Sequence, residues 1–118
     1  MARPPKSRNM GTMTEAAFWS MLRSHLRRLS LRWKPRAECL KRARRTYKGP
    51  NKRQKWEYQC CICKAWYSGK EVEADHIVSC GSLKSFEDLA VFTERLLVEV
   101  DGWQCICKTC HNVKTHSR

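Results

Sequence analysis

Two short stretches of the sequence decide the expected fold: CCIC at residues 60–63 and CKTC at residues 107–110. Each contains a C-x-x-C pair, and two residues between thiolates let both sulfurs of a tight turn reach one metal ion at about 2.3 Å. Two such pairs complete a tetrahedral four-cysteine site, which is closed to further ligands and therefore structural. The sequence thus predicts a structural Zn²⁺ held by Cys60, Cys63, Cys107 and Cys110.

The other four cysteines leave alternatives open. Cys61 and Cys105 lie beside the two pairs and could compete with them as ligands. Cys39 and Cys80 are expected to be small buried apolar residues. The 43 residues between Cys63 and the second pair exceed the usual short zinc-ribbon spacing. A candidate active-site hairpin between the two pairs would explain an insert of that length.

The length of 118 residues leaves room for one small domain plus an extension. The first residues contain no apolar signal-like core, and no apolar run approaches the roughly 20 residues of a membrane span. We therefore expect a cytoplasmic protein (host cytoplasm if it is phage-encoded) without a membrane partner. Thiols stay reduced in that compartment, so paired cysteines there hold metal more often than they form disulfides.

Positive charge is concentrated in one half of the chain. Residues 1–60 carry 17 Lys/Arg against 3 Asp/Glu, whereas residues 61–118 carry 7 against 8. A surplus confined to one half indicates a polyanionic partner, and nucleic acid is a better candidate than an anionic membrane surface. Contacts of this kind go to the phosphate backbone and position a protein without reading sequence.

Residues 1–56 are predicted to form a basic, mostly helical DNA-binding extension. A helix should begin near Thr14 as N-cap and end before Pro35, since the residue preceding proline avoids helical angles. A second helix is expected over 36–46, broken by Gly49 and Pro50. The first helix carries one apolar stripe at helical spacing, made of Phe18, Leu22, Leu26, Leu29 and Trp33.

Residues 57–118 are predicted to form a small α+β domain. Alternation favours a hairpin over 58–67 and a strand over 72–78, with a short strand at 103–106 and a helix from Lys108. Between the strands, Ser85 and Asp88 resemble a capping box that would open a further helix.

The candidate catalytic residues lie next to the cysteine pairs. Asp75 offers a hard oxygen ligand and His111 an imidazole, and two protein ligands leave room on a metal for water and a phosphate oxygen. His76 could take the proton from an attacking water, because imidazole titrates near neutrality. Glu73 is expected to be a solvated strand residue or to join the metal site, and Lys114 to touch phosphate or complement the end of its helix.

One geometric condition attaches to this hypothesis. Neighbouring residues on a regular strand point to opposite faces. For Asp75 and His76 to serve the same phosphate, the chain must bend, bulge or end there.

The segments EVEADHIV at residues 71–78 and CKTCHNVKT at residues 107–115 resemble the HNH (ββα-metal) endonucleases. The resemblance is strongest to the cysteine-containing, zinc-stapled kind common among bacteriophage proteins, and it covers residues 57–115, about half the chain. It implies a treble-clef-like fold in which Asp75 and His111 bind the catalytic metal, His76 is the general base and the four cysteines hold zinc. The chain departs from the family at Gly102, where an Asn that orients the general base is usual.

The leading hypothesis is therefore a metal-dependent DNA endonuclease that uses Mg²⁺, Mn²⁺, Ni²⁺ or Zn²⁺ and makes nicks or double-strand breaks. DNA is the expected partner, with a second copy of the chain or other phage DNA-processing proteins as further candidates. The alternative is a non-catalytic HNH-like zinc module that binds DNA or a partner nuclease. An RNA-binding zinc protein is a third possibility.

Overall fold

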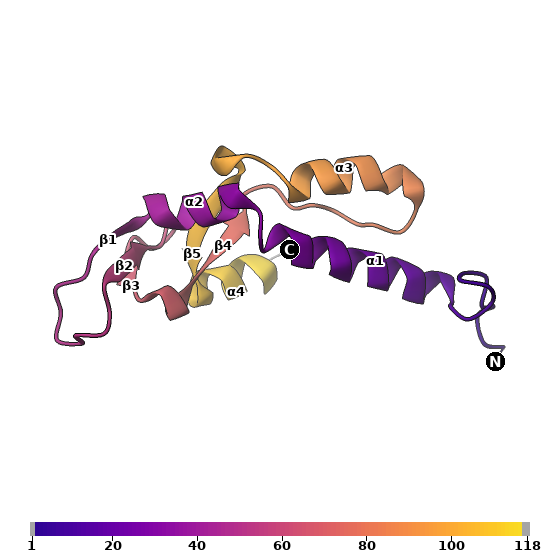
Figure 1. Ribbon diagram of the computed structural model, residues 1–118, viewed down its shortest axis with the longest axis horizontal. Helices are drawn as coiled ribbons and strands as arrows, with labels where there is room; N and C mark the ends of the chain where they lie inside the picture. The colour runs from indigo at the N-terminus through magenta and orange to yellow at the C-terminus, as the bar shows by residue number, and fades with distance from the viewer. Residues whose placement is uncertain (1, 117–118) are drawn as a thin grey trace. The chain divides into compact units, whose positions relative to one another are not determined.

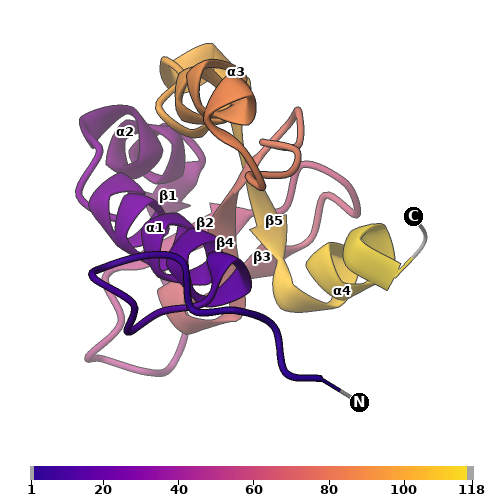
Figure 2. The same cartoon turned by 90° about the vertical axis from the view of Figure 1, so that its right-hand side faces the viewer.

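The computed structural model describes residues 2–116, which divide into two compact units interleaved along the sequence. Unit 1 combines the chain up to Arg32 with Ser79–Leu97, and unit 2 combines Trp33–Val78 with the chain from Val98 onward. Figures 1 and 2 follow the chain through both units. The boundary expected at residue 56 rests on charge and composition and stays a prediction.

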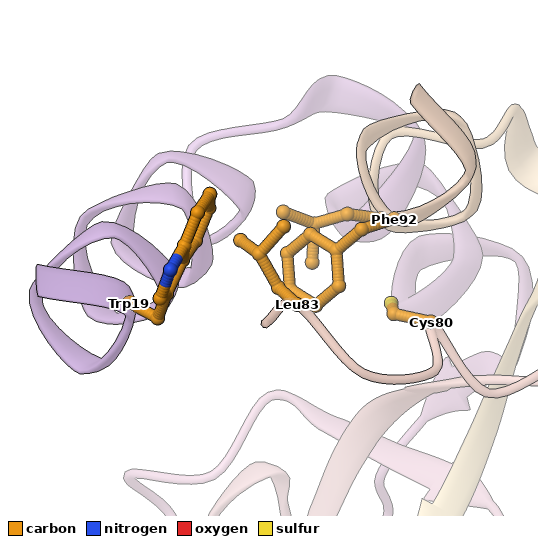
Figure 3. Close-up of a cluster of buried hydrophobic side chains, with 5 residues drawn as sticks. Trp19, Cys80, Leu83 and Phe92 are labelled. Carbon is orange, nitrogen blue, oxygen red and sulfur yellow. The ribbon is translucent and has the colours of Figure 1, made fainter. Parts of the chain in front are cut away.

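Unit 1 is built from two helices, α1 (Glu15–Ser30) and α3 (Phe86–Leu96). Thr14 is the N-cap of α1, as predicted, and its hydroxyl accepts a hydrogen bond from the Ala17 amide at 3.1 Å. Figure 3 shows Trp19 of α1 facing Leu83 and Phe92. These side chains share a core with Cys80 and Leu96, and the partly buried Phe18, Leu22 and Leu26 pack against it.

Two sequence predictions for unit 1 need correction. The apolar stripe does not run to Trp33, because α1 ends at Ser30 and Leu29 is exposed. Nor does Ser85 form a capping box within the described residues: its side chain makes no capping bond, and the Asp88 carboxylate accepts instead from the Lys84 amide at 3.0 Å. Cys80 is buried in the core, as expected.

Unit 2 contains two small antiparallel sheets and two helices among the described residues. One sheet has the order β1-β2-β3, from β1 (Arg44–Thr46), β2 (Trp56–Gln59) and β3 (Trp66–Tyr67). The other pairs β4 (Val72–His76) with β5 (Trp103–Cys107). The helices are α2 (Lys34–Arg42) and α4 (Lys108–His116), and one-turn 3₁₀ helices precede β4 (Gly69–Glu71) and β5 (Val100–Gly102).

The helix expected over 36–46 ends earlier than predicted. It covers Lys34–Arg42, and Arg44 and Arg45 lie instead in β1, paired with Tyr58 and Glu57 of β2. The guanidinium of Arg45 also forms an ion pair with Glu57 at 2.7 Å. Tertiary pairing with a neighbouring strand thus overrides the local helix pattern.

The long spacing between the cysteine pairs has a structural explanation. Residues 79–97, including α3, belong to unit 1, so the part of the insert that stays in unit 2 is mainly the β4–β5 pair. The core of unit 2 is built largely from that strand pair: it consists of Val72, Ile106 and three buried cysteines, Cys60, Cys105 and Cys107.

The expected α+β class is confirmed: the described part of the chain holds four α-helices and two small antiparallel sheets. Its helices are all too short or too polar to span a lipid bilayer.

The core of unit 1 predicts a mutational contrast between two neighbouring positions of α3. Phe92 is fully buried, whereas Val91 is 48% exposed. Phe92→Ala should lower the free energy of unfolding by about 3–5 kcal/mol, because it removes buried apolar surface and leaves a cavity. Val91→Ala should change it by less than about 0.5 kcal/mol. Chemical denaturation of both variants checks this, and equal losses would mean that Phe92 does not hold the core together.

Candidate functional site

The four cysteines of the two pairs come together in unit 2. One sulfur from each of Cys60, Cys63, Cys107 and Cys110 lies within 4.8 Å of the others, and the Cys63 and Cys107 sulfurs are 4.0 Å apart. A tetrahedral ion with metal–sulfur bonds of about 2.3 Å places its sulfurs about 3.8 Å apart. The cluster could therefore hold a structural metal ion such as zinc.

Backbone geometry prepares each pair for this arrangement. Cys60 directly follows β2, and its sulfur accepts from the Ile62 amide at 3.4 Å. Cys107 ends β5, and its sulfur accepts from the Cys110 amide at 3.4 Å in the first turn of α4. Lys64 adopts a positive φ of 64°, which turns the chain after the first pair so that its amide reaches the Cys60 carbonyl. Both pairs thus direct their sulfurs inward by local hydrogen bonding.

The environment favours thiolate at two of the four sulfurs. Burial raises the pKa of Cys60, but hydrogen bonds from backbone amides outweigh it and lower that pKa to about 6. A hydrogen bond with the Tyr67 hydroxyl, 3.3 Å from the Cys63 sulfur, lowers the pKa of Cys63. The hydrogen bond with Cys107 raises the pKa of Cys110 to about 12. The cluster thus gathers thiolate charge that a bound cation would neutralise.

The neighbouring cysteines lie outside this cluster. Cys39, Cys61 and Cys105 line a separate cavity, and burial raises the pKa of each thiol, that of Cys105 to about 12. The Cys61 thiol donates to the Gln104 side-chain oxygen at 3.4 Å. Cys61 and Cys105 are therefore protonated neighbours of the cluster and do not belong to it, and Cys39 is buried as expected.

Strand β4 and helix α4 bring Asp75 and His111 together. His111 Nε2 lies 3.5 Å from Asp75 Oδ1, and His111 Nδ1 lies 3.3 Å from Glu73 Oε2. Glu73 and Asp75 are two residues apart on one strand and so share a face. Both possible roles of Glu73 were left open by the sequence, and in the structure it contacts the imidazole rather than extending alone into solvent.

Two further side chains hold the Asp75 carboxylate. Lys114 Nζ donates to Asp75 Oδ2 at 2.5 Å and to the His76 carbonyl at 2.7 Å, and Gln104 Nε2 donates to Oδ2 at 3.1 Å. Burial raises the pKa of Asp75, but the bonds from Lys114 and Gln104 outweigh it and hold the pKa below its usual value. Asp75 is therefore a carboxylate with Oδ2 engaged and Oδ1 facing His111. Sequence reasoning missed Gln104, although its cross-strand pairing with Asp75 follows from the β4–β5 register.

His76 lies on the other face of the strand. Pairing between β4 and β5 is continuous from Val72 to His76, which is opposite Trp103. The two rings are 3.9 Å apart between centroids. Because side chains alternate along such a strand, His76 points away from the face that carries Asp75. The structure thus joins Asp75 with His111 and does not bring the His76 ring to the same face.

The Gly102 position is sterically restricted. A Cβ built there would lie 2.5 Å from a methyl carbon of Val98, so a larger residue requires that side chain to move. The Gly102 carbonyl accepts from the Ile77 amide at 3.0 Å, which fixes the backbone directly after His76. A backbone carbonyl thus supports this turn where the resembled family has an Asn.

Comparison with family models, curated proteins and solved structures finds no match to this chain.

The four-sulfur cluster predicts a metal-dependent fold for unit 2. Cys63→Ser or Cys110→Ser should abolish zinc binding and unfold this unit, since a structural metal contributes much of the folding free energy. Cys39→Ala, a change at a buried cysteine outside the cluster, should keep about one zinc per chain. Elemental analysis measures the zinc content and circular dichroism the folding of the cluster variants and of the Cys39→Ala control. Well-folded wild-type protein with clearly less than one zinc per chain would rule the structural metal out.

Proposed function

We propose that this protein is a metal-dependent endonuclease that hydrolyses phosphodiester bonds in DNA, with a structural zinc in the four-cysteine cluster. The observation that carries the proposal is the pairing of Asp75 with His111, whose facing atoms are 3.5 Å apart beside the cluster. The resemblance of the D-H-I and C-x-x-C-H-x-x-K-T segments to HNH endonucleases supports the same reaction.

The donor set at Asp75 and His111 suits a divalent cation. A carboxylate oxygen and an imidazole nitrogen are ligands accepted by Mg²⁺, Mn²⁺, Ni²⁺ or Zn²⁺ to different degrees. When bound, such an ion stabilises the negative charge that develops on the phosphate and the leaving oxygen. Asp75 Oδ1 and His111 Nε2 would hold it, since Asp75 Oδ2 is engaged by Lys114 and Gln104.

Neighbouring side chains prepare these two ligands. Glu73 Oε2 lies 3.3 Å from His111 Nδ1, and a proton held on Nδ1 by this carboxylate would leave Nε2, the nitrogen that faces Asp75, as the metal ligand. Lys114 and Gln104 keep Asp75 ionised and fix its orientation. These contacts reduce the motion that each ligand must lose when it binds a cation.

The general base in this proposal is His76, which would take a proton from the attacking water on an imidazole nitrogen. Its position constrains how it acts. His76 is the last residue of β4, and its ring packs on Trp103. The substrate phosphate must therefore approach the end of β4 for His76 and the Asp75–His111 pair to act on it together.

A non-catalytic zinc module that binds DNA or a partner nuclease is the second candidate. Three observations favour it: Lys114 already neutralises Asp75, His76 packs against an aromatic ring, and an Asn at position 102, as in the family, would require the Val98 side chain to move. The two candidates differ in cleavage, and both allow binding to DNA.

A plasmid assay with a panel of Mg²⁺, Mn²⁺ and Ni²⁺ tests the proposed reaction. The wild type should nick supercoiled DNA, and a single site of this kind cuts one strand at a time. Asp75→Asn and His111→Ala should lower the nicking rate by at least about a hundredfold, in line with the loss of a metal ligand. His116→Ala, an exposed histidine of the same helix α4, is the matched control and should leave the rate unchanged.

His76→Ala separates the base from the ligands. Loss of a general base should lower the nicking rate by about 10²–10⁴-fold without changing DNA affinity. Unchanged nicking by His76→Ala would refute the base assignment. Intact plasmid with every metal, combined with salt-sensitive DNA binding by the wild type, would favour the non-catalytic module.

A further inference from the structure

The densest positive charge of the chain lies on one hairpin. Residues 41–55 hold eight Lys/Arg and no Asp/Glu, which is a third of the 24 basic residues in an eighth of the sequence. The end of α2, strand β1 and the nine-residue segment that links β1 to β2 supply them. In Figure 1 this linking segment extends away from α2 and β5 of the same unit. Strand β1, this linking segment and the first residue of β2 (residues 44–56) are called the basic hairpin below, and they carry six of the eight basic residues.

Two arginines of the basic hairpin lie over aromatic rings. The Arg44 guanidinium lies 3.9 Å from the centroid of the Trp56 ring, and that of Arg45 lies 3.7 Å from the Trp66 ring. Pairing of Arg44 with Tyr58 and of Arg45 with Glu57 places these two arginines on opposite faces of the sheet. Stacking restricts the Arg44 side chain and so reduces the entropy lost when it contacts a ligand, whereas Arg45 is also ion-paired with Glu57 at 2.7 Å.

The tip of the basic hairpin has a defined backbone. The Tyr47 amide donates to the Lys55 carbonyl at 2.9 Å and closes its base. The Asn51 side chain accepts from the Arg53 amide at 3.2 Å, and its carbonyl accepts from the Gln54 amide at 3.1 Å. These bonds form a turn that presents Lys52, Arg53 and Lys55, whose side chains are all exposed.

We propose that the basic hairpin is the duplex-binding element of the protein and contacts the phosphate backbone of double-stranded DNA. The major groove of B-DNA admits a two-stranded β-ribbon, and Lys and Arg on such a ribbon reach the phosphates that border it. Each phosphate neutralised releases a bound counterion, so binding through this element depends steeply on salt.

The proposal deepens the nuclease function and rests on it for the choice of DNA as partner. The basic hairpin is joined directly to the candidate site: β2 runs into Cys60, and the Cys61 amide donates to the Cys105 carbonyl of β5 at 2.8 Å. DNA held by the hairpin is thus held by the same unit that carries Asp75 and His111.

The test compares two triple variants that each remove three exposed positive charges. One changes Lys52, Arg53 and Lys55 to Gln, and the matched control changes Lys6, Arg28 and Lys84 of unit 1 to Gln. Binding to a short fluorescein-labelled DNA duplex is measured by anisotropy over a range of salt concentrations, without added divalent cation. Zinc content and circular dichroism verify that both variants fold.

The hairpin variant should bind several hundredfold more weakly at about 0.1 M salt, and its plot of log affinity against log salt should be shallower by about 2.7. The control should change the slope by less than about 1. Equal effects in the two variants, or wild-type binding by the hairpin variant, would overturn the assignment. Tighter binding of the wild type to duplex RNA of the same sequence would overturn DNA as the partner.

The nicking assay keeps this proposal separate from the nuclease function. A wild type that binds duplex through the hairpin but leaves plasmid intact supports the hairpin assignment while the nuclease proposal fails. A wild type that nicks plasmid, with a hairpin variant that binds and nicks equally well, retains the nuclease proposal and overturns the hairpin assignment.

Discussion

The contact among four cysteine sulfurs is the constraint on which unit 2 depends. It joins two chain segments separated by 43 residues, and each segment lies at the end of a strand, β2 or β5. Helix α4 begins directly after Cys107, so the cluster also sets where His111 and Lys114 emerge. A small unit with few fully buried side chains would gain much of its order from a metal ion bound by these sulfurs. The position of the Asp75–His111 pair is a consequence of the cluster.

A balance of charges then defines the candidate site. Asp75 is bonded to Lys114 and Gln104 on one oxygen and faces His111 with the other, while Glu73 lies on the far side of that imidazole. Lys114 therefore compensates the negative charge of Asp75, one of the two carboxylates near His111. Asp75 Oδ1 and His111 Nε2 face each other at 3.5 Å, and a carboxylate oxygen and an imidazole nitrogen are both donors for a divalent cation. Positive charge dominates the basic hairpin of the same unit.

Local chemistry explains which features could be predicted from the sequence. The C-x-x-C spacing selected the four clustered cysteines, and Thr14 could be identified as a cap because its hydroxyl acts within one turn. Strand β1 could not be predicted, since Arg44–Thr46 becomes a strand through pairing with β2 and stacking on tryptophans distant in sequence. The assignment of residues 79–97 to unit 1 depends on packing against α1, which no local pattern records. Strand alternation indicated that Asp75 and His76 point to opposite faces of the strand. The pairing register of β4 with β5 was needed to place the His76 ring against Trp103.

X-ray absorption at the zinc edge of purified full-length protein examines the four-sulfur crosslink itself. Four sulfur neighbours at about 2.3 Å around one zinc are expected, without nitrogen or oxygen in the first coordination sphere. A sphere containing histidine nitrogen or water oxygen, or protein whose cysteines are paired as disulfides, would contradict the arrangement from which the fold and the site have been derived.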